Sequence, residues 1–336
     1  MKAAYTDAYL QQPEQLKISE VPVPEPDDDE ILVRVKAVSL NDFDWGIVTG
    51  KPWILRFFLG WRRPKVHISG CDIAGKIERV GAKVNRWQAG DRVFGDMSGS
   101  KFGGFAEFVC CKESAVEAIP DNVDYASASG VPQAAVLAWQ ALNLKGALRD
   151  GMRILINGAG GGVGAFGVQL AKAFNVHVTG VDKADKHAEM LGWGFDAVVD
   201  YQSEDFTVTE QPYDLVIDTK TDRQPWRYCR ALAPAGAYVT VGGKLGLHLL
   251  LLLCAPLIRL MTGKHLGIVA LHENENLSRF ASLMGEGKLS TPIDGPYPFE
   301  QLAQQLRYFL TARHRGKVVL TMATPAVQSA QKASHS

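Results

Sequence analysis

The chain has 336 residues, which is long enough for two domains of ordinary size. With 46% hydrophobic and 21% charged residues, its composition is that of a globular protein and excludes extensive disorder. Lysine plus arginine and aspartate plus glutamate number 36 each, so no net charge attracts nucleic acid or an anionic membrane. These properties favour a protein that acts on small molecules and has no nucleic-acid partner.

The first third of the chain reads as short strands separated by turns. Apolar and polar residues alternate over 30–40, and glycines mark bends in 70–96 and 103–113. We therefore expect a partly open β barrel. The start shows no apolar signal-peptide core, and the five cysteines include no CxxC pair, so a cytoplasmic location is expected.

The pattern changes from about Tyr125 onward. An alanine-rich helix is followed by apolar strands that alternate with amphipathic helices, which is typical of a doubly wound parallel sheet of α/β class. The strands are predicted at 153–158, 177–182, 196–201, 214–220 and 236–243. Two more amphipathic helices follow, at 276–287 and 299–310, and a last strand at 316–322 is expected to rejoin the first domain. Residues 324–336 are small and polar, and we expect a frayed end.

A strongly apolar segment, 245–260, follows the last strand of the alternating region. It is too short to span a bilayer and is interrupted by His248, Pro256 and Arg259. We expect a buried or interface helix and, with it, a homodimer. A membrane-surface contact is the less favoured alternative.

Glycines crowd the turn between the first apolar strand and the next helix, in INGAGGGVG at 156–164. Glycine allows a sharp turn, lets a pyrophosphate approach the bare backbone and lets the helix pack closely, while the free N–H groups of the helix face the anion. The pattern Ala-x-Gly-x-x-Gly therefore predicts a site for a nicotinamide dinucleotide. Its residues are Ala159, Gly160, Gly161, Gly162, Val163 and Gly164.

The residues after the second strand bear on the choice between NADH and NADPH. Asp182 stands where an acidic residue accepts a hydrogen bond from the ribose 2′-OH of NAD. Lys183 and Lys186 follow at once, and two ammonium groups suit the 2′-phosphate of NADP, which Asp182 alone would repel. The residues themselves leave both cofactors open.

Motifs along nearly the whole chain resemble those of the medium-chain dehydrogenase/reductase superfamily and, within it, of the zinc-lacking quinone oxidoreductase branch. They are AVSLNDFDW at 37–45, GCDIAGKIERVGAKVNRWQAGDRVFG at 70–95, GGFAEF at 103–108, LAWQAL at 137–142, INGAGGGVG at 156–164 and RGKVVL at 315–320. The resemblance implies a GroES-like barrel built from 1–124 and 262–336, with a Rossmann domain inserted at 125–261. It places the active site in the cleft between them.

The resemblance also implies roles for single residues. Lys186 and Tyr201 occupy positions where relatives hold the 2′-phosphate, and Arg313 lies near a third, which favours NADPH and leaves NADH possible. Asn41 and Asp44 match a family Asn-x-x-Asp near the nicotinamide and are the candidate catalytic residues. Gly242, after the last strand of the alternating region, is a further candidate for cofactor binding.

Zinc-using relatives carry a cysteine near the position of Asn41, a Gly-His-Glu where this chain has Gly70-Cys71-Asp72, and a four-cysteine lobe. This sequence has none of these, so no zinc or other metal is expected. Without a metal, hydride transfer needs an activated acceptor, such as a quinone or an α,β-unsaturated carbonyl. Flat acceptors of this kind are expected to lie in an aromatic pocket formed by Trp45, Trp53 and Phe57.

The leading interpretation is a zinc-independent, NADPH-dependent oxidoreductase that transfers hydride to a quinone or an α,β-unsaturated carbonyl. One alternative is an NAD(P)H-binding regulatory or structural protein with little turnover, because Gly46 and Leu137 replace a tyrosine and a threonine frequent in relatives. A second is an NAD(H)-dependent enzyme resembling alcohol dehydrogenases. A third is a peripheral membrane enzyme, suggested by the segment 245–260.

Overall fold

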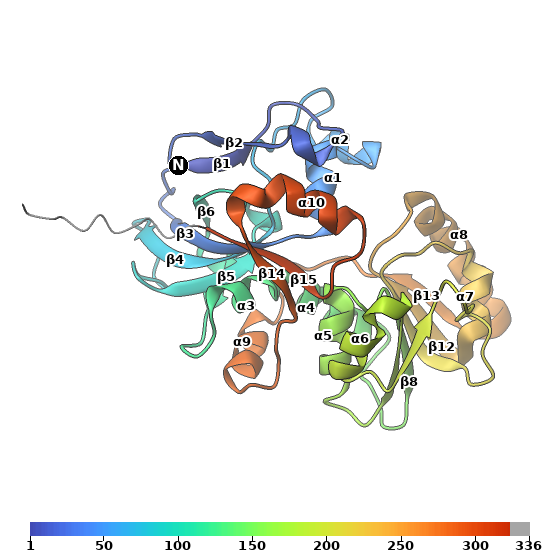
Figure 1. The fold of residues 1–336 in the computed structure, drawn as a ribbon. Coiled ribbons are helices and arrows are strands. Elements are labelled where there is room, and N and C mark those ends of the chain that lie inside the picture. Colours follow the sequence, from blue (N-terminus) through green and yellow to red (C-terminus); the bar gives the residue numbers. More distant parts are fainter. Residues whose placement is uncertain (323–336) are drawn as a thin grey trace, which may run out of the picture.

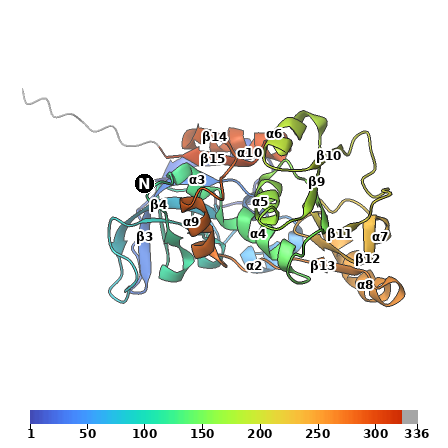
Figure 2. The same ribbon diagram turned by 90° about the horizontal axis from the view of Figure 1, so that it is seen from below.

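A computed structural model describes residues 1–322, and the polar end expected at 324–336 lies outside them. Two large sheets organise two lobes that lie side by side (Figure 1), and a third sheet has only two strands, β1 (Lys2–Tyr5) and β2 (Lys17–Glu20). Both ends of the described chain belong to one lobe, and the middle of the chain forms the other, as the view from below also shows (Figure 2). The predicted fold class, a GroES-like barrel with an inserted Rossmann domain, is confirmed.

The barrel lobe is built on a seven-stranded sheet, in which six strands follow the order β14-β15-β3-β4-β5-β7 and the seventh, β6, pairs with β3. β15 pairs antiparallel with β3, so the last strand rejoins the first domain as predicted. Ile31, Val33 and Val35 of β3 alternate along the strand and enter one core with Ile73 and Ile77 of β4. The strands of this lobe are β1 (Lys2–Tyr5), β2 (Lys17–Glu20), β3 (Glu30–Ser39), β4 (Asp72–Val80), β5 (Arg92–Asp96), β6 (Phe108–Lys112), β7 (Glu117–Ala118), β14 (Ile293–Pro298) and β15 (Lys317–Thr321).

The second lobe holds a six-stranded, wholly parallel sheet with the order β10-β9-β8-β11-β12-β13. This is the doubly wound order of dinucleotide-binding domains. Its strands are β8 (Arg153–Asn157), β9 (His177–Asp182), β10 (Ala197–Asp200), β11 (Tyr213–Asp218), β12 (Leu232–Thr240) and β13 (His265–Ile268). The first five were predicted. β13 was not, because four residues are too few to show a period, and it lies beyond the expected domain boundary at residue 261.

Alternate strand residues of this sheet enter cores on opposite faces. Ile154 and Ile156 pack on the side of α4 (Pro132–Asn143) and α5 (Gly162–Ala171). Leu155 and Val216 pack on the side of α7 (Pro225–Ala231) and α8 (Leu245–Thr262). The helices of the chain are α1 (Asp42–Thr49), α2 (Arg56–Leu59), α3 (Tyr125–Ser129), α4 (Pro132–Asn143), α5 (Gly162–Ala171), α6 (His187–Gly192), α7 (Pro225–Ala231), α8 (Leu245–Thr262), α9 (Leu277–Gly285) and α10 (Leu302–Leu310). Short 3₁₀ turns lie at Pro13–Gln15, Trp53–Leu55, Ser98–Ser100, Glu113–Ala115, Ala184–Lys186 and Phe299–Gln301.

The helix α8 differs from the others because most of its apolar side chains are uncovered. Its inner side packs Leu251, Ala255 and Ile258 against the core, but Leu253 and Leu260 are 79% and 85% exposed. By length and composition alone it is apolar enough to cross a membrane, with a mean hydropathy of 1.9. The helix expected at 245–260 is confirmed, but it is not a buried helix, because its outer side is a free apolar surface. Its role as an interface helix stays a prediction.

Candidate functional site

A cleft of about 840 Å³ lies between the two lobes, which is within the size range of cofactor and substrate sites. The barrel lobe contributes Leu40, Asn41, Phe43, Phe309, His314 and Lys317 to its lining. The Rossmann lobe contributes Gly158, Gly161, Gly162, Val163, Asp182, Lys186, Tyr201, Lys220, Arg223 and Gly242. The cleft thus combines most of the predicted dinucleotide residues with one of the two predicted catalytic residues.

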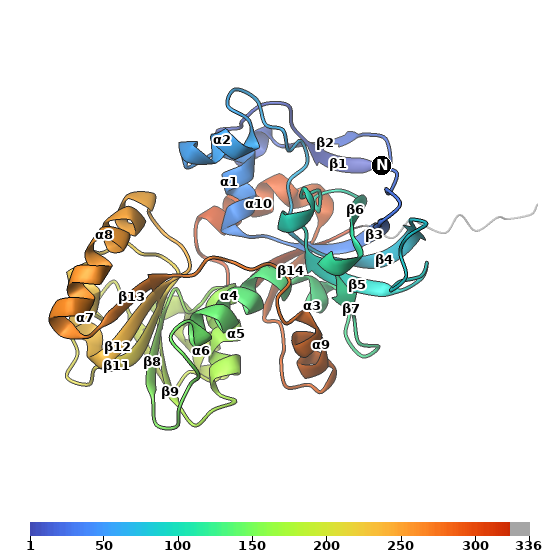
Figure 3. The ribbon, with the colours of Figure 1, turned by 180° about the vertical axis from the view of Figure 1, so that it is seen from behind.

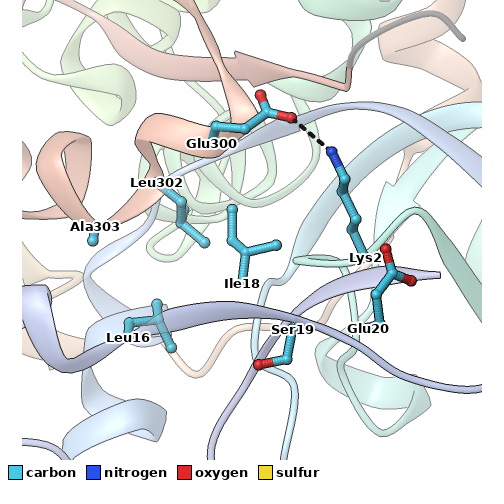
Figure 4. A pocket seen from close by; sticks show the side chains of 8 residues that line it. All are labelled: Lys2, Leu16, Ile18, Ser19, Glu20, Glu300, Leu302 and Ala303. Carbon is cyan, nitrogen blue, oxygen red and sulfur yellow. Dashed lines mark hydrogen bonds and ion pairs between the residues drawn. The ribbon is translucent and has the colours of Figure 1, made fainter.

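A smaller depression of about 330 Å³ lies on the barrel lobe between β2 and the start of α10 (Figure 4). Leu16, Ile18 and Leu302 line it, and the Lys2 ammonium reaches the Glu300 carboxylate at 3.5 Å across its rim. Aliphatic walls with an exposed ion pair provide no group for hydride chemistry. We assign this depression no function.

The glycine turn joins β8 to α5 at the inner end of the cleft. The N–H groups of Gly158 and Ala159 donate to the Val181 carbonyl at 2.9 and 3.1 Å, which fixes the turn against the second strand. Gly158 has a φ of +79°, a conformation that favours glycine. A side chain on Gly164 would lie 2.3 Å from the Ala159 carbonyl oxygen, so the helix packs directly on the turn.

The space in front of α5 fits a pyrophosphate. Gly161 caps the helix in extended backbone, at φ −96° and ψ −177°, and no side chain accepts from the first turn. The N–H groups of Gly162 and Val163 therefore have no intrahelical acceptor. The nearest atoms to a Cβ on Gly161 would be the Gly158 carbonyl oxygen at 3.5 Å and His314 Nε2 at 3.8 Å, so the approach to these N–H groups is open.

The barrel lobe reaches the glycine turn through the loop before β15. The N–H of Gly316 donates to the Gly160 carbonyl at 2.9 Å, and Gly161 and Gly316 form an isolated parallel bridge. Beside this contact, His314 is buried and stacks on Phe309 with ring centroids 4.6 Å apart. The two lobes are therefore in direct backbone contact at the place where the cofactor phosphates would lie.

Asp182 is turned back onto the glycine turn. Its Oδ2 accepts from the Gly160 N–H and its Oδ1 from the Lys183 N–H, both at 2.9 Å, and Lys186 Nζ lies 3.5 Å from Oδ1. Both Asp182 and Lys186 are buried, and burial lowers the pKa of Lys186 while Asp182 opposes this effect. Because two N–H groups and the Lys186 ammonium already neutralise the Asp182 carboxylate, it repels a 2′-phosphate less strongly than the sequence suggested.

The same end of the cleft holds basic side chains that sequence reasoning missed. Lys220 and Arg223 line it together with Tyr201, whereas Lys183 and Arg313 do not. Arg223 is paired with Asp205 at 3.0 Å, but Lys220 has no acidic group within 4.0 Å among the described residues. The sequence could have indicated Lys220, because it lies two residues after the end of β11. The carboxyl ends of parallel strands meet at one edge of the sheet, where the cofactor binds.

At the barrel end of the cleft, Asn41 lies at the start of α1 with Asp44 behind it. Asp44 is fully buried, accepts from the Asn41 N–H at 2.8 Å and the Cys71 N–H at 2.9 Å, and does not line the cleft. Burial raises the pKa of Asp44 to about 7, against the two donated hydrogen bonds. Asp44 thus holds the backbone around Asn41, and the Asn41 side chain faces the cleft.

Lys317, the first residue of β15, fixes the orientation of the Asn41 amide. Its Nζ donates to Asn41 Oδ1 at 2.7 Å and lies 3.2 Å from both the Leu40 carbonyl oxygen and Asp72 Oδ2. Asn41 Nδ2 in turn donates to Asp72 Oδ2 at 3.0 Å. Lys317 and Asp72 are both almost fully buried. This leaves one Asn41 N–H for a ligand in the cleft.

Comparisons with known proteins agree with this architecture. The family model described as "Alcohol dehydrogenase GroES-like domain" matches residues 27–121, and the one described as "Zinc-binding dehydrogenase" matches 193–320. Quinone-oxidoreductase QR1 of Triphysaria versicolor is 30% identical over 95% of this chain and 98% of its own, and a homolog from Spinacia oleracea is 31% identical over 91% and 93%. This chain belongs to the quinone oxidoreductase-like family of medium-chain dehydrogenases/reductases. Among solved structures, the quinone oxidoreductase from Coxiella burnetii superposes with a TM-score of 0.84 at 25% identity, over 96% of this chain and 99% of that one.

The aromatic residues that were expected to form the substrate pocket of this medium-chain dehydrogenase/reductase lie elsewhere. Trp45 packs against the barrel core, and Trp53 and Phe57 are each 61% exposed on the outer side of the molecule. The cleft lining includes none of the three. The apolar walls are instead formed by Phe43, Leu137, Val163, Phe206, Val241, Val269, Leu271 and Phe309.

Within residues 1–322, no group of three or more His, Cys, Asp or Glu side chains is placed to hold a metal ion. Cys71 is buried, and burial together with the Asp44 carboxylate raises the pKa of its thiol well above the usual range. Zinc independence stays a prediction for this member of the family. Metal analysis of the purified protein tests it.

The buried His314 is expected to lower the free energy of unfolding of this oxidoreductase at acid pH. Burial, with Lys186 and Lys220 nearby, lowers its pKa to about 3 from an ordinary 6.5. Between these values the unfolded chain binds a proton that the folded chain does not, so the free energy of unfolding falls as the pH drops from 6.5 toward 3. We expect His314→Phe to reduce this slope by up to about 1.4 kcal/mol per pH unit. Urea unfolding across that range measures both slopes, and equal slopes contradict the assignment.

Proposed function

We propose that this protein transfers hydride from NADPH to a quinone or an α,β-unsaturated carbonyl, without zinc, in the cleft between the lobes. The observation that carries the proposal is one cleft that joins an open glycine turn, basic side chains and an oriented Asn41 amide to apolar walls. The names of relatives support it. One is the NADPH-dependent alkenal/one oxidoreductase of Arabidopsis thaliana, 28% identical over 90% of this chain and 74% of its own.

The bound nicotinamide supplies the hydride, and the residues of this chain position the acceptor. Asn41, whose amide is held by Lys317 and Asp72, offers its remaining N–H to the nicotinamide carboxamide or to the acceptor oxygen. Phe43, Leu137 and the other apolar walls exclude water from the transfer. The negative charge that develops on the acceptor oxygen is stabilised by a donor that needs no reorientation.

For the cofactor phosphate, we propose that Lys186 and Lys220 hold the 2′-phosphate of NADPH together with Tyr201. Lys220→Met is expected to weaken NADPH binding about tenfold, because an unpaired ammonium that faces the phosphate is lost, and to leave NADH binding nearly unchanged. Fluorescence titration with both cofactors measures the ratio. Lys145→Met, at an exposed lysine outside the cleft lining, is the matched control. Wild-type protein that binds NADH more tightly than NADPH would show that Asp182 decides the choice instead.

The activity itself is tested by following NADPH oxidation with a panel of quinones and conjugated enones. We expect turnover with several members of both groups. Tight NADPH binding without turnover on any acceptor would favour the regulatory or structural alternative. Oxidation of simple alcohols by NAD that exceeds enone reduction would favour the alternative resembling alcohol dehydrogenases.

The division of the chain and its assembly are also proposals. We propose that the Rossmann domain extends from about residue 125 through β13, seven residues beyond the boundary at 261 that the sequence suggested. β13 is the last strand of its sheet and has a free edge, on which we propose that a second copy pairs in a cytoplasmic homodimer. Analytical ultracentrifugation of the purified protein tests the dimer.

A further inference from the structure

Two uncovered apolar surfaces lie on the molecule, one on each lobe. The aromatic surface surrounds α2 and the 3₁₀ turn before it, and it consists of Trp53, Ile54, Phe57, Phe58 and Trp61. The leucine surface is the outer side of α8, and it consists of Leu249, Leu252, Leu253, Leu257, Leu260 and Met261. α2 and α8 lie along the same lower edge in Figure 2 and on the near face in Figure 3.

Both surfaces lie in stretches of sequence without acidic residues. Residues 45–71 and 224–272 contain no aspartate or glutamate, and each stretch contains five lysines and arginines. None of these ten cations has an acidic group within 4.0 Å in the part of the chain that the structure describes. Each surface therefore lies in a stretch of sequence with an excess of positive charge, although the net charge of the whole chain, which argued against a membrane contact, is zero.

The form of the two surfaces favours a lipid bilayer over a second copy of this chain. Trp53 and Trp61 are exposed, and Trp61 is followed directly by Arg62 and Arg63, a combination of aromatic and basic side chains that suits the boundary between headgroups and acyl chains. A second copy placed across either surface by a two-fold axis brings cation against cation, which costs free energy. An anionic bilayer instead accepts both the apolar side chains and the charge.

We propose that the aromatic surface and the leucine surface form one docking face for an anionic lipid bilayer. α8 lies in the plane of the interface and does not cross the membrane, because Leu251, Ala255 and Ile258 stay packed against the core. The exposed basic side chains near its two ends, Lys244 and Arg259, reach the headgroups.

On each lobe, residues of the docking face lie close in sequence to residues that line the cleft. Phe43, which lines the cleft, lies on α1 ten residues before Trp53, and Gly243, which also lines it, lies two residues before the first residue of α8. If the proposed function holds, docking keeps the cleft near the bilayer, and the acceptors it favours are lipid-soluble quinones. The docking itself does not depend on turnover.

The test is co-sedimentation of the full-length protein with vesicles of phosphatidylcholine, with and without phosphatidylserine. We expect binding to the anionic vesicles that weakens as salt rises. Arg62→Glu/Arg63→Glu is expected to reduce it about tenfold or more, and Leu253→Gln/Leu260→Gln is expected to reduce it at every salt concentration. Lys17→Glu/Arg149→Glu changes the charge equally at exposed positions outside both surfaces and should leave binding unchanged.

Reduction of a water-soluble acceptor, measured on the same variants, separates docking from activity. We expect all variants to retain it, together with wild-type thermal unfolding, because none of the changed residues lines the cleft or the core. Background sedimentation of the wild type, or equal binding to neutral and anionic vesicles, overturns the docking face whether or not the enzyme turns over. Loss of a dimer in Leu253→Gln/Leu260→Gln with unchanged vesicle binding assigns the leucine surface to a second copy and overturns the proposal.

Discussion

Lys317→Met is expected to lower the free energy of unfolding by about 3 to 5 kcal/mol and to reduce turnover at least about tenfold. The Lys317 ammonium lies 3.2 Å from the Asp72 carboxylate, and both side chains are almost fully buried. Removal of the cation leaves a carboxylate without a charged partner in a place that water does not reach. Its remaining donors, among them the Ser39 hydroxyl at 3.0 Å and the Gln133 N–H at 3.1 Å, do not replace the lost charge.

The double variant Lys317→Met/Asp72→Asn separates the two effects. It removes both charges, so we expect most of the lost stability to return. The Asn41 amide still lacks the Lys317 donor to its Oδ1, so turnover should stay low while NADPH binding stays near wild type. Urea unfolding, cofactor titration and a separate comparison of kcat and KM measure these outcomes. A single variant as stable as the wild type, or a double variant with full kcat, contradicts the positioning role of Lys317.

Gly161→Ala is expected to weaken NADPH binding about tenfold to a hundredfold without loss of stability. The backbone at this position is extended, and an added methyl group would meet nothing closer than 3.5 Å in the protein. That methyl group stands in front of the first-turn N–H groups of α5, where the pyrophosphate must approach.

Gly164→Ala is the matched control for this variant. Its methyl group would lie 2.3 Å from the Ala159 carbonyl oxygen, which belongs to the backbone and has no free rotation. We therefore expect this variant to be less stable, whatever its affinity for the nucleotide. Thermal unfolding and fluorescence titration of both variants measure the contrast. Wild-type NADPH affinity in Gly161→Ala would place the pyrophosphate somewhere other than this turn.

Sequence reasoning predicted those parts of the fold that depend on local patterns of apolar residues and glycines. The strand at 153–157 and the helix after it follow from a run of apolar residues and a glycine turn, and both lie where they were expected. β13 escaped prediction because its four residues form a strand only by pairing with β12. Local patterns therefore located the turn and the order of the sheet better than the domain boundary.

The site residues that were missed depend on contacts between distant parts of the chain. Lys317 lies 276 positions from Asn41, and nothing near it in sequence indicates that its ammonium meets that amide. Asp182 stood at the expected position, but its hydrogen bond from the Gly160 N–H depends on the exact path of the turn. Trp53 and Phe57 showed apolar character without showing the direction in which their loop would fold.

The contact between Gly316 and the glycine turn has a consequence for how the protein comes to function during its synthesis. The turn at 158–161 is synthesised 155 residues before Gly316, whose N–H meets the Gly160 carbonyl. Lys317 arrives at the same moment and completes the other end of the cleft. A nascent chain that has left the ribosome only as far as α9 contains every strand of the Rossmann sheet but lacks Gly316 and Lys317, so we expect the cofactor to stabilise the cleft only after these two residues have been made.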